Sequence, residues 1–169
     1  QQIENATYFF EADGRLVRGT VSIEGKTYHF AEDGKLLTGW QTLDGQVYYF
    51  DATGLPIPGF QSIEGKRYYF SNDGMRLSGW QQIGDTKHYI FPDGTVRKGT
   101  TSIGGKTYHL LKDGKMTTGW ITLGKKRYFF GNDGIRRQGL TRIDKKVYGF
   151  HPTKGYLLKG LYKIDSRYY

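Results

Sequence analysis

Short alternating runs of apolar and polar residues recur every twenty residues along the chain. In residues 61–80, for example, a run at block positions 1–3 leads to Glu64-Gly65 at positions 4 and 5, and a second run follows at positions 6–10. Alternation with a period of two is typical of half-buried β-strands, and an Asp-Gly or similar pair between two such runs favours a type I′ turn. Each block therefore predicts one β-hairpin, and no block predicts a helix.

The position of this turn determines which residues face each other across each hairpin. Position 3 pairs with position 6, position 1 with position 8, and position 20 of the preceding block with position 9. Because side chains alternate between the two faces of a strand, positions 1, 3, 6, 8 and 10 share one face. In most blocks this face carries Ile or Leu at position 3, Tyr at position 8 and Phe at position 10, so we expect it to form the core. Positions 20, 2, 7 and 9 share the other face, which we expect to meet solvent or ligand.

Two glycines mark the same places in every block up to residue 140, at positions 14 and 19, beginning with Gly14 and Gly19. An aspartate often precedes the first of them, and this Asp-Gly pair predicts the turn into the next block. We therefore read the chain as a single module of seven 20-residue repeats at 1–140, a 21-residue repeat at 141–161 and a partial repeat at 162–169.

A longer period is superimposed on the short one. Trp40, Trp80 and Trp120 are 40 residues apart, and residues 21–40 resemble residues 101–120, which indicates an 80-residue duplication. An isolated hairpin is marginally stable in water, so the hairpins must stack on one another. The predicted fold class is an all-β solenoid of stacked β-hairpins with about 20 residues per repeat.

The sequences GWQTLDGQVYYF at residues 39–50 and GFQSIEGKRYYF at residues 59–70 resemble the cell-wall-binding or glucan-binding repeat family. Members of that family include the choline-binding modules of pneumococcal surface proteins, the glucan-binding regions of glucansucrases and the repetitive domains of large clostridial toxins. The resemblance covers all eight full blocks. It implies a superhelix of hairpins with roughly threefold rotation and ligand sites made of aromatic residues between successive hairpins.

The choline-binding subgroup typically carries a tryptophan directly before its Tyr-Tyr pair, which helps to cage a quaternary ammonium group by cation–π attraction. Here that place is taken by residues such as Val47, Arg67, Lys87 and Arg127. A cationic wall would repel a cationic ligand. The resemblance therefore disfavours choline and looks closer to the YYF-type repeats of glucansucrases and clostridial toxins.

The seven pairs between positions 20 and 9 are candidate ligand sites. Four are aromatic on both sides, two join Thr to His, and the last is Leu140 with Gly149. An aromatic ring stacks well on the C–H face of a pyranose, while neighbouring polar side chains bind its hydroxyls. The alternative is that these rings only pack against the next hairpin. The candidate carbohydrate-binding residues are Trp40, Gln41, Thr42, Tyr49, Phe60, Tyr69, Trp80, Gln82, Lys87, Tyr89, Trp120, Thr122, Arg127 and Phe129.

The composition narrows the chemistry that the chain can perform. The 169 residues include 14 Tyr and 10 Phe but no Cys, which suits short strands with aromatic contacts. The four histidines lie at least 21 residues apart without zinc-ligand spacing, and the acidic residues lie mainly at turns. We therefore expect no catalytic residues, no metal and no cofactor. No apolar run is long enough to cross a bilayer.

The formal net charge of +9 favours anionic partners. Lysines and arginines are spread along the chain, and we expect most of them to form a solvated face. The others are candidate contacts to teichoic acid or another wall polyanion. Nucleic-acid binding is not expected, because the hairpin pattern already accounts for the aromatic residues.

We therefore predict a non-catalytic module that binds glucan, cell-wall polysaccharide or host glycan. It would target an attached enzyme or toxin to a polysaccharide surface, as part of a larger secreted or bacterial cell-surface protein, since the chain begins at Gln1 rather than Met. Several weak sites on one polymer would act by avidity. Two alternatives stay open: electrostatic attachment to teichoic acid or another wall polyanion, and a structural spacer or receptor-docking region.

Overall fold

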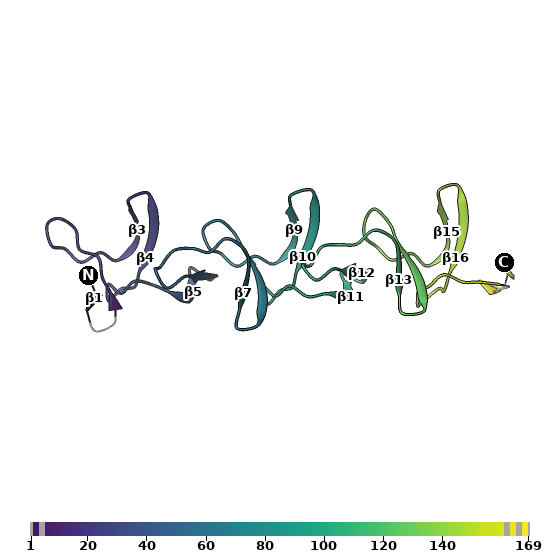
Figure 1. Cartoon of the computed structure of the whole chain (residues 1–169), viewed down its shortest axis with the longest axis horizontal. Coiled ribbons are helices and arrows are strands. Elements are labelled where there is room, and N and C mark those ends of the chain that lie inside the picture. Colours follow the sequence, from purple (N-terminus) through teal and green to yellow (C-terminus); the bar gives the residue numbers. More distant parts are fainter. Residues whose placement is uncertain (1, 4–5, 161–162, 165–166, 169) are drawn as a thin grey trace. The chain divides into compact units, whose positions relative to one another are not determined.

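The computed structural model describes residues 2–3, 6–160, 163–164 and 167–168, which form strands and turns and no helix (Figure 1). Part of the predicted partial repeat at 162–169 lies outside the described residues. The strands pair as antiparallel hairpins: β1 (Gln2–Ile3) with β2 (Ala6–Thr7), β3 (Gly19–Ile23) with β4 (Lys26–Phe30), β5 (Gly39–Leu43) with β6 (Gln46–Phe50), β7 (Gly59–Ile63) with β8 (Lys66–Phe70), β9 (Gly79–Ile83) with β10 (Thr86–Ile90), β11 (Gly99–Ile103) with β12 (Lys106–Leu110), β13 (Gly119–Leu123) with β14 (Lys126–Phe130), β15 (Gly139–Ile143) with β16 (Lys146–Phe150), and β17 (Lys163–Ile164) with β18 (Arg167–Tyr168).

The predicted register is confirmed. In the β5–β6 hairpin, for example, Trp40 lies opposite Tyr49, and Leu43 lies opposite Gln46. The turn between these strands has φ angles of 49° at Asp44 and 76° at Gly45. Positive φ at both central residues is the property that defines a type I′ turn. The local signal of an acidic residue followed by glycine therefore fixes both the turn and the pairing of the strands.

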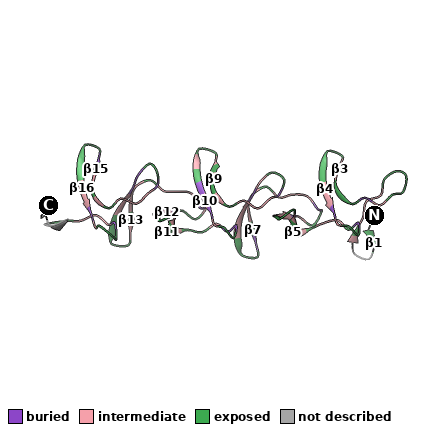
Figure 2. Cartoon of the chain, turned by 180° about the vertical axis from the view of Figure 1, so that it is seen from behind, coloured by how far each residue is buried: buried purple, intermediate pink, exposed green. Residues whose placement is uncertain are grey.

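The residues at position 10 form the centre of the core. Phe50, Phe70, Phe130 and Phe150 are each at most 1% exposed. The tyrosines at position 8, which we expected in the core, lie at its edge: Tyr108 is buried, whereas Tyr48, Tyr68 and their other equivalents in the hairpins from β3 onward are half-buried. The tips of the hairpins are mostly exposed (Figure 2). Alternation along the strands therefore sorts the residues as predicted, with tyrosine in an intermediate place.

Backbone hydrogen bonds join most of the hairpins to the segment that follows the next one, although Pro56, at position 16 of the third block, has no N–H to donate. The N–H at position 16 donates to the carbonyl at position 7 of the preceding hairpin, as from Arg76 to Val47 at 2.7 Å and from Met116 to Lys87 at 2.8 Å. These bonds satisfy a strand edge that a lone hairpin would leave open. The hairpins are stacked through this pairing, and the predicted all-β solenoid is confirmed. The same bond joins Leu36 to Thr7, Arg136 to Thr107 and Leu157 to Arg127.

The chain divides into two compact units. Unit 1 comprises Gln1–Gly79 and Ile90–Thr95, and unit 2 comprises Trp80–Tyr89 and Val96–Tyr169. The first boundary lies at residue 80, where the second copy of the predicted duplication begins. Each unit is a stack of hairpins with its own aromatic core.

The glycine at position 14 allows successive blocks to approach closely. Gly74 has a φ of +82°, and a Cβ at this position would lie 2.9 Å from Cβ of Pro56 and 3.1 Å from the carbonyl oxygen of Tyr49. By contrast, Gly65 in the β7–β8 turn has a φ of +75°, and a Cβ at this position would have no other atom within 4 Å. The two glycines therefore share a backbone conformation and differ in the space around them.

We expect Gly74→Ala to destabilise unit 1 more than Gly65→Ala. Both substitutions place a Cβ at positive φ, which costs about 1–2 kcal/mol. Only Gly74→Ala also forces a methyl group into packed atoms, which adds about 1–3 kcal/mol. Urea unfolding followed by far-UV circular dichroism would show the lower midpoint for Gly74→Ala. Equal midpoints for the two variants would contradict a role for close approach at position 14.

Candidate functional site

Trp40 lies where its own hairpin meets the next one. Its ring centroid is 5.0 Å from that of Tyr49 across the β5–β6 hairpin, with 79° between the ring planes. It is 4.9 Å from the ring of Tyr68, which belongs to the following β7–β8 hairpin, with 71° between the planes. Edge-to-face contacts of this kind are favourable between aromatic rings. The three rings form one cluster assembled from two successive hairpins.

The same arrangement recurs twice in unit 2. Trp80 lies 5.0 Å from both Tyr89 and Tyr108. Trp120 lies 5.1 Å from Phe129 and 5.0 Å from Tyr148. We refer to these groups by their tryptophans as the Trp40, Trp80 and Trp120 clusters. Trp80 is 39% exposed, and the other two indoles are half-buried, so each ring packs on the next hairpin and also reaches the surface.

The third ring of each cluster was not among the predicted site residues. Tyr68, Tyr108 and Tyr148 occupy position 8, which the alternation assigns to the core. A signal for them was nevertheless present, because each lies 28 residues after a tryptophan. The pattern within one hairpin cannot show that contact, since it arises only when hairpins stack.

Two of the predicted aromatic residues carry an arginine on one ring face. The guanidinium carbon of Arg67 lies 4.5 Å from the centroid of Phe60, and that of Arg127 lies 4.3 Å from the centroid of Trp120. The ring of Phe60 also contacts that of Tyr69, at 4.6 Å. At both places the chain supplies its own cation to the aromatic face.

The predicted polar residues separate into two groups. Thr42, Gln82 and Thr122 are exposed at position 2, on the face of the hairpin that carries position 20, and Lys87 is exposed at position 7. Gln41 occupies position 1 on the opposite face, where its Nε2 donates to the carbonyl oxygen of Thr38 at 2.7 Å. The structure thus gathers the first group near the tryptophans and leaves Gln41 apart from them.

Unit 1 also contains a cavity of about 640 Å³ that the sequence did not indicate. Thr20 takes the place of a tryptophan in the β3–β4 hairpin, so no indole reaches Tyr48 of the next hairpin. The imidazole of His29 lies opposite Thr20 and stacks on Phe50 at 4.9 Å. The cavity is lined by Gly25, Lys26, Thr27, His29, Tyr48, Leu55, Pro56, Asn72 and Asp73.

The corresponding junction in unit 2 carries a long side chain at position 16. Arg136 stands 80 residues after Pro56, and its Nη2 donates to the carbonyl oxygen of Thr153 at 2.9 Å. The Thr–His pair itself is kept there, with Thr100 Oγ1 3.0 Å from His109 Nδ1. The two copies therefore differ at position 16, where Pro56 lines the cavity of unit 1 and Arg136 reaches Thr153 in unit 2.

Burial shifts the titration of both paired histidines. It lowers the pKa of His29 below its ordinary value, although the carboxylate of Asp73 opposes the shift. Burial also lowers the pKa of His109. In the folded protein both imidazoles therefore favour the neutral form, which suits their hydrogen bonds with threonine hydroxyls.

Among the described residues, no group of three His, Asp or Glu side chains is placed to hold a metal ion. The described part of the chain also contains no helix with the length and apolar character needed to cross a membrane.

Two repeat models match the sequence. The model of the choline-binding repeat matches residues 17–54, and that of the cell wall binding repeat matches residues 59–74, 78–95, 102–116 and 118–135. Together they cover more than half of the chain, and both describe binding repeats. No curated protein matches the chain in sequence.

Solved structures from Streptococcus pneumoniae share the fold. CbpJ of strain TIGR4 has a TM-score of 0.86 at 27% identity, over 94% of this chain and 58% of that protein. Choline binding protein F, crystallised in the presence of a tetrasaccharide-pentapeptide analogue of peptidoglycan, has a TM-score of 0.82 at 26% identity, over 92% of this chain and 56% of that one. The choline-binding domain of CbpL, at 23% identity and a TM-score of 0.67 over 94% of this chain and 85% of that domain, supports the fold alone. The chain thus spans a little over half the length of CbpJ and choline binding protein F.

We expect the stability of the protein to fall between neutral and mildly acidic pH. A lowered folded pKa means that the unfolded chain binds protons first as the pH falls, so the contribution of each histidine is complete above the unfolded pKa of about 6.5 and is lost below it. The urea midpoint should therefore be lower at about pH 5 than at about pH 7.5. In the double variant His29→Asn/His109→Asn the difference should shrink. The carboxyl groups with lowered pKa, such as Asp51 and Asp133, titrate below this window. An unchanged pH dependence in the double variant would contradict the assignment.

Proposed function

We propose that this chain, which belongs to the cell-wall-binding family of choline-binding repeats, attaches a larger protein to bacterial cell-wall polysaccharide. The observation that supports this most strongly is the recurrence of one three-ring arrangement at Trp40, Trp80 and Trp120. Each cluster would hold one stretch of the polymer. The chain acts as a binding module, at the surface of the cell that carries the polymer.

Sugar binding follows from how these rings are exposed. A half-exposed indole offers apolar area to the C–H face of a pyranose, and two flanking rings limit where the sugar can lie. Thr42, Gln82 and Thr122 lie exposed on the same faces and supply hydroxyl or amide groups for hydrogen bonds. One such site binds weakly, but several on one polymer raise the effective affinity by two to four orders of magnitude.

The cavity in unit 1 supports the same function. Its wall includes the rings of Tyr48 and His29, and its rim carries the amide of Asn72 and the carboxylate of Asp73. An apolar wall with a few polar groups at fixed places is the usual composition of a small-ligand site. We assign it as a further sugar subsite, distinct from the three tryptophan clusters.

A quaternary ammonium group, such as the choline after which choline binding protein F is named, is the second candidate ligand. The Trp40 cluster is the place that suits it best, because position 7 there is the uncharged Val47. At Trp120 the guanidinium of Arg127 already lies over the ring and would repel a second cation. Choline binding would therefore be restricted to part of the chain.

We expect the double variant Trp40→Ala/Trp120→Ala to lose most of its polysaccharide binding. Removing two of three stacking sites should weaken binding by roughly tenfold or more, because avidity depends on the number of sites. Binding can be measured by affinity electrophoresis in dextran gels and by co-sedimentation with purified peptidoglycan–teichoic acid, each at low and high salt. Neither method depends on tryptophan fluorescence.

Leu140→Ala is the matched control, since Leu140 occupies the same block position opposite Gly149 and lacks an aromatic partner there. Thermal unfolding of both variants checks that they fold. Salt-insensitive binding that survives the double variant would contradict stacking and favour a spacer or docking role. Binding that vanishes at high salt and survives the variant would favour electrostatic attachment to wall polyanions. If choline displaces the polysaccharide from the wild type and from Trp120→Ala, but not from Trp40→Ala, the result would identify choline as a ligand of the Trp40 cluster.

A further inference from the structure

The net positive charge of the protein comes from unit 2 alone. Unit 1 contains 7 basic and 11 acidic residues, a net charge of −4, whereas unit 2 contains 18 basic and 5 acidic residues, a net charge of +13. Basic residues occur along the whole sequence, but they are more numerous in unit 2, and the acidic residues are more numerous in unit 1. The overall charge of +9 is therefore the sum of two units whose net charges have opposite signs.

A cavity of about 570 Å³ lies within the basic unit. One wall is the tip and second strand of the β13–β14 hairpin, with Lys125, Lys126 and Arg127, and the other is the segment that ends at Lys159. The carbonyl oxygen of Arg127 accepts a hydrogen bond of 2.7 Å from the N–H of Leu157, which holds the two walls together. The lining residues are Thr122, Lys125, Lys126, Arg127, Tyr156, Leu157, Leu158 and Lys159, with no acidic side chain among them.

The four cations of this cavity form no ion pair within the described part of the chain. Asp133, in the turn after β14, is paired with Arg137 at 3.0 Å. Lys126 Nζ lies 4.2 Å from the ring centroid of Tyr156 instead. Like charges held around one cavity repel each other, so an anion placed between them relieves an unfavourable field.

The duplication supplies an internal comparison. The residues 80 positions before Lys125, Lys126 and Arg127 are Gly45, Gln46 and Val47. The tryptophan of this hairpin is the same in both copies, and each cluster keeps a tyrosine from the next hairpin. The aromatic cluster is therefore common to the two copies, whereas the triple charge belongs to unit 2 alone.

We propose that this cavity binds the phosphate groups of an anionic phosphodiester polymer. Lysine ammonium groups and a forked guanidinium are the side chains that best satisfy phosphate oxygens. The volume is within the range of small-ligand sites and accommodates a phosphate together with its neighbouring units. Tyr156, Leu157 and Leu158 provide apolar area for those units. The cavity shares Thr122 and Arg127 with the Trp120 cluster, but Lys125, Lys126 and Lys159 belong to the cavity alone, so the two proposals can fail separately.

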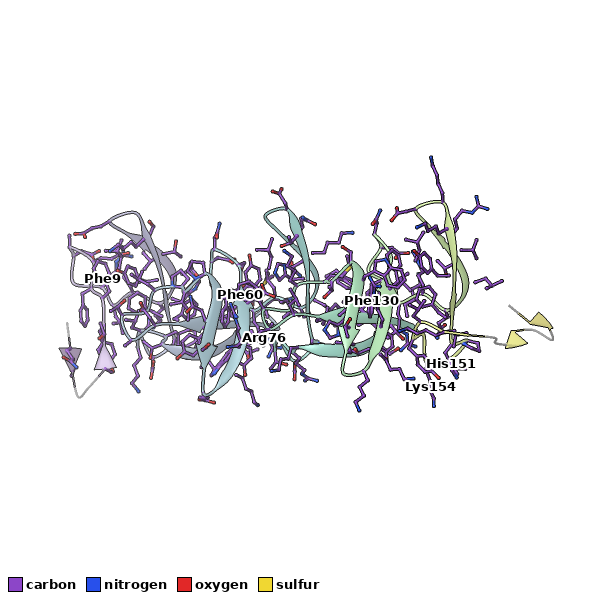
Figure 3. All side chains as sticks on the ribbon, turned by 45° about the vertical axis from the view of Figure 1, so that its right-hand side comes forward. Phe9, Phe60, Arg76, Phe130, His151 and Lys154 are labelled. Atoms are coloured by element: carbon purple, nitrogen blue, oxygen red, sulfur yellow. The ribbon has the colours of Figure 1, made fainter. Side chains whose placement is uncertain are left out.

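The test compares two triple variants with the same change in charge. Lys125→Gln/Lys126→Gln/Lys159→Gln removes three cations of the cavity and leaves Arg127, which contacts Trp120. Lys145→Gln/Lys146→Gln/Lys154→Gln removes three exposed cations of unit 2 that do not line the cavity. Lys154 lies in the turn after β16, beside His151 (Figure 3), and its backbone N–H bond to His151 Nδ1 does not involve the altered side chain.

Binding of sodium polyphosphate would be measured by isothermal titration calorimetry at low salt. We expect the cavity variant to bind about tenfold more weakly or worse and the matched variant less than about threefold more weakly. Equal losses in the two variants would overturn the proposal, since they would mean that only net charge matters. Equally tight binding of polyglutamate would overturn the preference for phosphate, and equally tight binding of inorganic phosphate would overturn the assignment to a polymer. Retention of dextran binding by the cavity variant separates this site from the tryptophan clusters.

Discussion

The rest of the structure depends on backbone pairing between successive blocks, which in most of them is a hydrogen bond from the N–H at position 16 to the carbonyl at position 7 of the preceding hairpin. A two-stranded hairpin of five-residue strands leaves its outer edge unpaired and buries little area, so it is marginal alone. Pairing with the next block satisfies that edge and brings position 14 against position 16 of the previous block. Glycine is required there because a side chain at Gly74 would overlap Pro56.

This pairing creates a junction between successive repeats, and a few side chains determine the shape and chemistry of each junction. A tryptophan at position 20 meets the tyrosine at position 8 of the next hairpin and makes an aromatic cluster. Where threonine takes its place, a cavity lies beside Pro56 in the first copy, and Arg136 stands at the corresponding position in the second copy, where it bonds to Thr153. The junctions therefore differ mainly in the side chains at positions 20, 7 and 16, while the hairpin register is the same throughout.

Features that depend on contacts within one hairpin could be predicted from the sequence, whereas features that depend on contacts between hairpins could not. Register, turns and the buried Phe50 and Phe70 depend on neighbours within one hairpin, where period-two alternation and an acidic residue before glycine are direct signals. The position of Tyr68 and the cavity beside His29 depend on residues of different hairpins, 20 or more apart in sequence. No pattern within a block could show them. The contact of Arg127 with Trp120 could be predicted only in part. The register placed Arg127 opposite Thr122, on the same face as Trp120, but the contact with the ring depends on the conformations of the folded side chains.

The two units show how a repeat scaffold separates stability from specificity. Side chains at the tips of the hairpins take no part in the hydrogen bonds between blocks, so a change there alters charge with little effect on stacking. Gly45, Gln46 and Val47 in one copy correspond to Lys125, Lys126 and Arg127 in the other, yet both hairpins keep the same register. Aromatic stacking loses little strength with salt, whereas attraction between exposed charges is screened beyond about 10 Å. A module that carries both kinds of site can therefore retain its hold on a wall polymer at high ionic strength and still be steered toward it at low ionic strength.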